Sequence, residues 1–108
     1  MNEIWKDVPN YEGLYQVSNI GRVKSIKFKK HKILKPSIVG NAYYQCSLWD
    51  NSINKRFYVH TLVSIAFLGH KPNGRKLVVD HINNIKTDNR VENLQIITQR
   101  ENLSKDRH

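Results

Sequence analysis

The sequence contains a single cysteine, Cys46, which excludes an internal disulfide and any zinc site built from several cysteines. No apolar run approaches the roughly 20 residues that a membrane-spanning helix needs. The N-terminus lacks the basic segment, apolar core and small-residue cleavage site of a signal peptide. We therefore expect a soluble, intracellular protein that has no membrane partner. We also expect no small-molecule cofactor.

Acidic residues are also scarce. Nine Asp and Glu are outnumbered by eighteen Lys and Arg, which gives a net charge of +9 and an isoelectric point near 9.9. Such an excess on a small chain commonly indicates a polyanionic partner, because each neutralised phosphate releases counterions. The alternative is a basic surface that is merely solvated. The length of 108 residues fits one small globular domain, or one domain with a short appendage.

Turn residues and alternating side chains predict a β-hairpin near the N-terminus. The turn Asn19-Ile20-Gly21 separates the segments Leu14–Ser18 and Arg22–Phe28, in which apolar and polar residues alternate. Three aromatic residues are expected to form the core of this region rather than to stack on nucleic-acid bases: Trp5, Tyr11 and Tyr15.

A basic stripe begins after the hairpin turn and consists of Lys24, Lys27, Lys29, Lys30, Lys32 and Lys35. Residues two apart in a strand point the same way, so Lys27 and Lys29 are predicted to share one face. Such a face suits the backbone of a duplex. The alternative is that these lysines only protect a sheet edge from pairing with another chain.

The middle of the sequence predicts a second strand pair followed by a helix. Asn41–Leu48 and Lys55–Val59 are expected to pair around a turn at Asp50-Asn51-Ser52. In His60–Leu68 the apolar residues are spaced four apart, which indicates a helix, and Gly69 is expected to end it. Cys46 is expected to be a small packing residue rather than a nucleophile. His60 is expected to cap the turn or to contact a phosphate.

The C-terminal third predicts a strand that delivers a carboxylate and an imidazole side by side. Leu77–Val79 is a short, mostly β-branched strand that ends in Asp80-His81, and Leu94–Ile97 is a second strand after a polar, turn-rich loop. A hard oxygen ligand beside a group that moves protons near neutral pH suits metal-assisted hydrolysis.

A capping box then predicts the start of a final helix. Thr98 and Glu101 are three residues apart, so each can bind the free backbone N–H of the other. Asn102 falls in the first turn of this helix or just beyond it. The order of strand, loop, strand and helix is a ββα unit, with Asp80-His81 on its first strand and Asn102 on its helix.

These residues resemble the HNH endonucleases, in the branch whose last motif residue is asparagine. His81, Asn93 and Asn102 match the three motif positions, and the resemblance runs almost continuously from Val59 to Asn102. The segment EIWKDVPNYEGLYQVSNIGRVKS is similar to a short DNA-interacting motif that precedes HNH domains in phage and intron homing nucleases. The resemblance implies an α+β fold, with a small antiparallel β-hairpin region over residues 1–56 and a ββα-metal unit with a supporting helix over 57–108.

The resemblance also implies a metal-dependent endonuclease that hydrolyses the phosphodiester bonds of double-stranded DNA. Asp80 and Asn102 would each give an oxygen to one divalent cation, expected to be Mg²⁺, for which Mn²⁺ or another divalent cation could substitute. His81 would act as the general base on the attacking water. Asn93 would hold the loop and orient His81. Phosphate contacts are expected from twelve basic side chains: Arg22, Lys24, Lys27, Lys29, Lys30, Lys55, Arg56, His60, Arg75, Lys86, Arg90 and Arg100.

Several alternatives stay open at this point. One active site cuts one strand at a time, so nicking is expected, and both a monomer and a dimer are compatible with the sequence. The chain stops at His108, which fits either a compact free-standing nuclease or a fragment. The other readings are a non-catalytic DNA-binding module that keeps the HNH scaffold, and an RNA-directed protein. The resemblance places the protein in the cytoplasm of a bacterial host, encoded by a phage or an intron.

Overall fold

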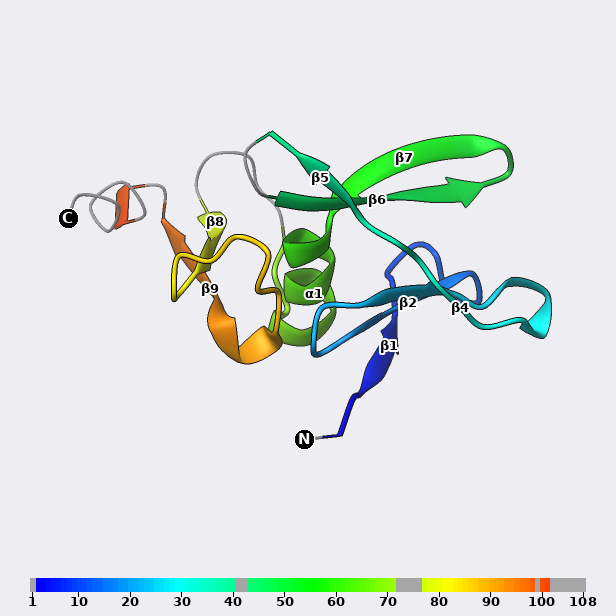
Figure 1. Ribbon diagram of the computed structural model, residues 1–108, viewed down its shortest axis with the longest axis horizontal. Helices are drawn as coiled ribbons and strands as arrows, with labels where there is room; N and C mark the ends of the chain where they lie inside the picture. Colours follow the sequence, from blue (N-terminus) through cyan, green and yellow to red (C-terminus); the bar gives the residue numbers. More distant parts are fainter. Residues whose placement is uncertain (1, 41–42, 72–76, 99, 102–108) are drawn as a thin grey trace.

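A computed structural model describes residues 2–40, 43–71, 77–98 and 100–101 of the chain. Within these ranges, three small antiparallel sheets surround helix α1 (Val59–Leu68), which contacts strands of all three (Figure 1). Strands and a helix are thus combined in the predicted α+β class. No helix in the described part of the chain is long and apolar enough to cross a membrane.

The first sheet is built by the N-terminal region. Its strands lie in the order of the chain: β1 (Trp5–Asp7), β2 (Tyr15–Ser18), β3 (Val23–Ser25) and β4 (Lys32–Ile33). The predicted hairpin is β2–β3, in which Tyr15 pairs with Ser25 and Val17 with Val23. Gly21 in its turn has φ +92°, a conformation that glycine adopts without steric cost. The outer strands β1 and β4 were not predicted.

The predicted continuation of the second hairpin strand to Phe28 is wrong. The strand ends at Ser25, and Lys27–Lys29 form a 3₁₀ turn, η1, in which Phe28 and Lys29 have φ of 56° and 60°. The side chains of Lys27 and Lys29 therefore do not share the face of a strand. The ammonium of Lys27 donates a hydrogen bond to the backbone oxygen of Trp49 at 3.1 Å, which ties this turn to the second sheet.

The second sheet contains the predicted strand pair, with different boundaries. It has the order β5 (Ser37–Val39), β6 (Tyr43–Asp50) and β7 (Ile53–Tyr58). Asn51 and Ser52 form the turn, both at positive φ, as a type I′ hairpin turn requires. Val59 belongs to α1 rather than to the strand. The expected division between residues 56 and 57 falls inside β7.

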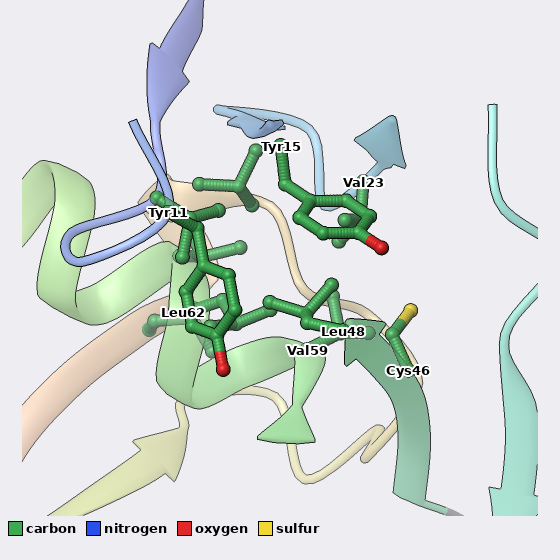
Figure 2. Close-up of a cluster of buried hydrophobic side chains, with 11 residues drawn as sticks. Tyr11, Tyr15, Val23, Cys46, Leu48, Val59 and Leu62 are labelled. Atoms are coloured by element: carbon green, nitrogen blue, oxygen red, sulfur yellow. The ribbon is translucent and has the colours of Figure 1, made fainter. Parts of the chain in front are cut away.

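Helix α1 packs into one core with the N-terminal sheet, as Figure 2 shows. Leu62 and Val63 of the helix are buried with Leu48 of β6 and Val17 of β2. Gly69 ends the helix in the left-handed conformation with φ 66°, and its N–H donates to the carbonyl of Ser64.

The three N-terminal aromatic residues do not all belong to this core. Tyr11 and Tyr15 are buried in it and contact each other edge to face, with ring centroids 5.9 Å apart. Trp5 is half-buried at the periphery, where the ammonium of Lys24 lies 4.3 Å from its ring centroid. The prediction of core packing is therefore confirmed for the tyrosines but not for Trp5. Cys46 is a buried packing residue, and its burial raises the pKa of the thiol to about 11.

The third sheet is the predicted strand pair of the C-terminal region. Strand β8 (Leu77–His81) pairs with β9 (Leu94–Thr98), and His81 lies opposite Leu94. The capping box is present. The N–H of Thr98 donates to the Glu101 carboxylate at 3.2 Å, and the N–H of Glu101 donates to the Thr98 hydroxyl at 3.1 Å. Residues 100 and 101 are helical, whereas Asn102 and Arg75 lie outside the described residues.

Candidate active site

Strand β8 delivers Asp80 and His81 to its end, where each is only 5% exposed. The side-chain amide of Gln95, directly opposite on β9, donates a hydrogen bond to the Asp80 carboxylate at 2.8 Å. A buried carboxylate is costly unless it is hydrogen-bonded or paired with a cation. Gln95 therefore fixes the orientation of an acidic group that the sheet holds away from bulk water.

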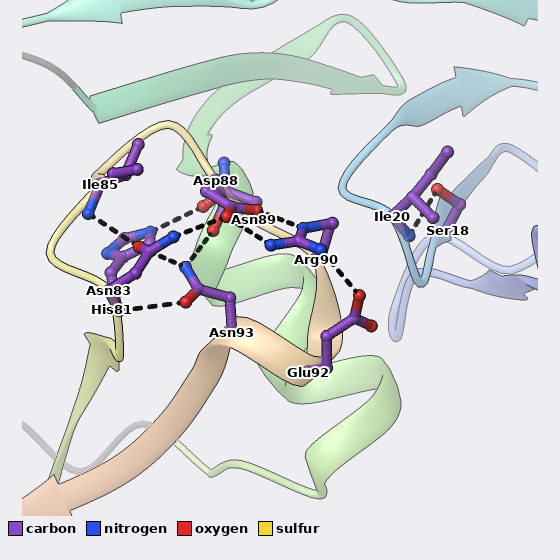
Figure 3. Close-up of polar contacts among 10 residues, drawn as sticks. All are labelled: Ser18, Ile20, His81, Asn83, Ile85, Asp88, Asn89, Arg90, Glu92 and Asn93. Carbon is purple, nitrogen blue, oxygen red and sulfur yellow. Dashed lines mark hydrogen bonds and ion pairs between the residues drawn. The ribbon is translucent and has the colours of Figure 1, made fainter. Parts of the chain in front are cut away.

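The ring of His81 is held by a residue that the sequence did not single out. Nε2 of His81 lies 2.8 Å from Oδ1 of Asn89, which is 3% exposed (Figure 3). An amide oxygen can only accept, so Nε2 is the donor and carries the proton. A neutral ring then has its lone pair on Nδ1, which is the form that a proton acceptor needs. Asn89 lies in a run of polar loop residues without periodicity, so nothing in the sequence singled it out.

Asn93 fixes the loop between the two strands. Its side-chain oxygen accepts from the N–H of Asn83 at 3.1 Å, and its amide nitrogen donates to the side-chain oxygen of Asn83 and the backbone oxygen of Asp88, both at 2.9 Å. The backbone oxygen of Asn93 also accepts from the N–H of Ile82 at 2.8 Å. Asn93 thus connects both ends of the loop, whereas the His81 ring donates its hydrogen bond to Asn89.

An ion pair inside the loop involves one of the predicted DNA-contacting residues. The guanidinium of Arg90 binds both carboxylate oxygens of Asp88 at 2.8 Å and approaches Glu92 at 3.2 Å. The hydrogen bonds from Arg90 hold the pKa of Asp88 well below its usual value. Arg90 is therefore part of the loop scaffold, although the residue stays solvent-exposed.

Three neighbouring rings, those of Tyr43, Tyr58 and His60, form an aromatic wall beside the His81 ring. The ring centroid of His60 is 5.1 Å from that of His81, and His60 stacks on Tyr58 at 5.2 Å. Burial lowers the pKa of His60 to about 4, and the charge of a protonated His81 adds to this effect. Tyr43 completes the wall, and the ammonium of Lys86 lies 5.1 Å from its ring centroid. His60 is therefore neutral near pH 7 and lies beside the site.

The other predicted phosphate-binding residues lie on several elements. Arg22 is ion-paired with Glu3, and Lys24 covers the Trp5 ring. Lys55 and Arg56 are exposed neighbours on β7, so their side chains point to opposite faces of that strand. The exposed residues Lys29 and Lys30 and the helical residue Arg100 complete the described part of the set.

Comparison with known proteins matches both parts of the chain. Residues 3–49 match the NUMOD4 motif, and residues 57–104 match the HNH endonuclease family. The DNA endonuclease I-HmuI of Bacillus phage SP01 is 43% identical over 99 residues, which cover 92% of this chain and 55% of that protein. An uncharacterized HNH endonuclease, L247, of Acanthamoeba polyphaga mimivirus is 42% identical over 94% of this chain and 25% of its own length.

A solved structure has the same fold. This structure shows DNA binding and cleavage by the HNH homing endonuclease I-HmuI. It superposes on the present chain with a TM-score of 0.82 at 41% sequence identity. The superposition covers 94% of this chain and 56% of that one. The chain thus spans about half the length of the phage protein.

Proposed function

The chain belongs to the HNH endonuclease family, and we propose that it is a DNA endonuclease that hydrolyses phosphodiester bonds at Asp80-His81. One observation carries this proposal: a buried, oriented carboxylate lies next to an imidazole whose Nε2 proton is held by an amide oxygen. The likeness to a phage DNA endonuclease over 92% of the chain supports DNA as the substrate.

His81 is the general base in this proposal. Its Nδ1 takes a proton from the water that attacks the scissile phosphorus, while Nε2 stays bound to Asn89. The bond from phosphorus to the 3′ oxygen breaks as the new bond forms, and the leaving 3′ oxygen takes up a proton from solvent. A positioned general base typically contributes about 10²- to 10⁴-fold to the rate. Asn93 acts indirectly, by holding the loop that carries Asn89.

The donor groups suit a divalent cation, which HNH nucleases generally use. No three His, Cys, Asp or Glu side chains are grouped as a metal cage within the described ranges. A single buried carboxylate such as that of Asp80 suits Mg²⁺, because Mg²⁺ keeps several waters and binds through one or two carboxylates plus substrate phosphates. Asp80 would be the carboxylate ligand, and Asn102 is proposed as the second oxygen ligand. When bound, the cation supplies positive charge that stabilises the developing negative charge on the phosphate.

Nicking of one strand and a location in the cytoplasm of a phage-infected bacterium are parts of the same proposal. A single Asp80-His81 pair serves one strand at a time, and the phage source of I-HmuI supports the location.

A plasmid assay tests this function. Supercoiled plasmids carrying varied sequences are incubated with the protein and Mg²⁺, or Mn²⁺, with EDTA as the control. We expect conversion to open circles that EDTA abolishes. Tight binding without cutting in every divalent metal would instead identify a non-catalytic DNA-binding module. Cleavage of RNA but not of DNA would reassign the substrate.

A further inference from the structure

We propose that Asn89 is the positioning residue of His81 and that the N-terminal hairpin turn holds Asn89 in place. This inference rests on the proposed role of His81 as general base. It implies that the N-terminal region does more than contact DNA, because its turn supports the catalytic loop from behind.

The contact between Asn89 and His81 is buried on both sides. Asn89 is 3% exposed and His81 is 5% exposed, and their polar atoms are 2.8 Å apart. The amide nitrogen of Asn89 is also buried, yet it has no hydrogen-bond partner among the described residues. A buried donor without a partner lowers the stability of the folded protein. That cost is understandable if the role of Asn89 is to place its oxygen at the His81 ring rather than to stabilise the fold.

The hairpin turn touches the backbone of Asn89 directly. A Cβ placed on Gly21 would lie 2.8 Å from Cβ of Asn89 and 3.0 Å from its carbonyl oxygen. Two residues further along the loop, the N–H of Val91 donates to the backbone oxygen of Asn19 at 2.8 Å. The turn and the loop lie close together in Figure 3. Gly21 thus allows an approach that no other residue permits.

The turn is itself anchored, so it can act as a rigid support. The side-chain oxygen of Asn19 accepts from the N–H of Ile4 at 2.8 Å, and the Ser18 hydroxyl accepts from the N–H of Arg22 at 3.1 Å. Carbon atoms in ordinary contact are about 3.5–4.0 Å apart. A methyl group at position 21 must therefore push Asn89 away by about 1 Å, and a displacement of that size at a reacting group can cost about 100-fold in rate.

A pair of glycine variants isolates this contact. Gly21→Ala and Gly13→Ala both place a side chain at positive φ, of +92° and +78°, but nothing lies within 4 Å of a Cβ at Gly13. We expect the single-turnover cleavage rate of Gly21→Ala to fall about 10- to 100-fold. DNA affinity should change less than about threefold, and Gly13→Ala should cut at nearly the wild-type rate. Equal rates for the two variants would overturn the inference.

The ring nitrogens of His81 report the same contact without cleavage. In ¹H–¹⁵N spectra of the metal-free protein, we expect the wild type to show a protonated Nε2. Asn89→Ala and Gly21→Ala should shift His81 toward a mixture of the two neutral forms. Asn89→Asp, which keeps an acceptor at the same place, should restore a protonated Nε2 and most of the rate lost in Asn89→Ala.

The two readouts separate the two proposals. Ring-nitrogen signals that are unchanged in Asn89→Ala and Gly21→Ala would overturn the inference even in an active nuclease. Altered signals in a protein whose wild type cuts no nucleic acid would instead overturn the proposed function and leave the coupling between turn and loop in place.

Discussion

Replacing Asn93 by alanine should destabilise the whole protein. The side chain is 5% exposed and makes three hydrogen bonds that close the loop between β8 and β9. Each such bond contributes about 1 kcal/mol net, so the loss should be about 3 kcal/mol. A domain of this size loses about 4–8 °C in Tm per kcal/mol, which predicts a fall of roughly 12–24 °C.

Urea and thermal unfolding of Asn93→Ala measure this loss. Gln16→Ala is the matched control, because it removes a single solvent-exposed amide contact to Asp7 and should change the free energy of unfolding by less than about 0.5 kcal/mol. Asn93→Asp places a second carboxylate oxygen against the oxygens of Asn83 and Asp88 that now accept from the amide, so it should lose at least as much stability as Asn93→Ala. A loss below about 1 kcal/mol in Asn93→Ala would refute the view that Asn93 closes the loop.

Two further predictions concern charge. Lys29→Glu should weaken DNA binding, because the exposed Lys29 can contact a phosphate. The slope of the logarithm of the binding constant against the logarithm of the salt concentration should fall in magnitude by about 1 or more. An unchanged affinity and slope would show that Lys29 is merely solvated. The pKa of His60 is lowered to about 4 in the folded protein, whereas an unfolded chain has the ordinary histidine value of about 6.5. As the pH falls from about 6.5 to about 4, the unfolded chain therefore takes up a proton that the folded protein does not. The free energy of unfolding should decline over this range by up to roughly 3 kcal/mol. In His60→Gln this decline should be smaller, and a wild-type decline in the variant would contradict the assignment.

Local patterns in the sequence predicted the elements that carry the site. Alternation and turn chemistry predicted the β2–β3 hairpin, apolar runs predicted β8 and β9, and Thr98 with Glu101 predicted the capping box. Each of these features is determined by residues that lie close together in the sequence, so each can be predicted without knowing the fold. The prediction that the strand continues through Lys27–Lys29 was wrong, because nothing in this lysine-rich segment signals a 3₁₀ turn with positive φ.

The supports of the site depend on contacts between distant segments. Asn89 looks like any polar loop residue until the fold brings its oxygen to His81 and its backbone to Gly21. The same is true of Gln95, whose amide reaches Asp80 only because β9 pairs with β8 in the observed register. The sequence singled out Asp80 and His81 as candidate site residues, whose roles stay a prediction, whereas it gave no sign of Gln95 and Asn89, which hold them in place.

The most direct test of the account is the single-turnover rate of DNA cleavage by His81→Ala, with DNA affinity measured in parallel. If Nδ1 of His81 accepts the proton of the attacking water, the rate with Mg²⁺ should fall about 10²- to 10⁴-fold, while the affinity for DNA changes less than about threefold. A variant that cuts at the wild-type rate would contradict the assignment of Asp80-His81 as the hydrolytic centre.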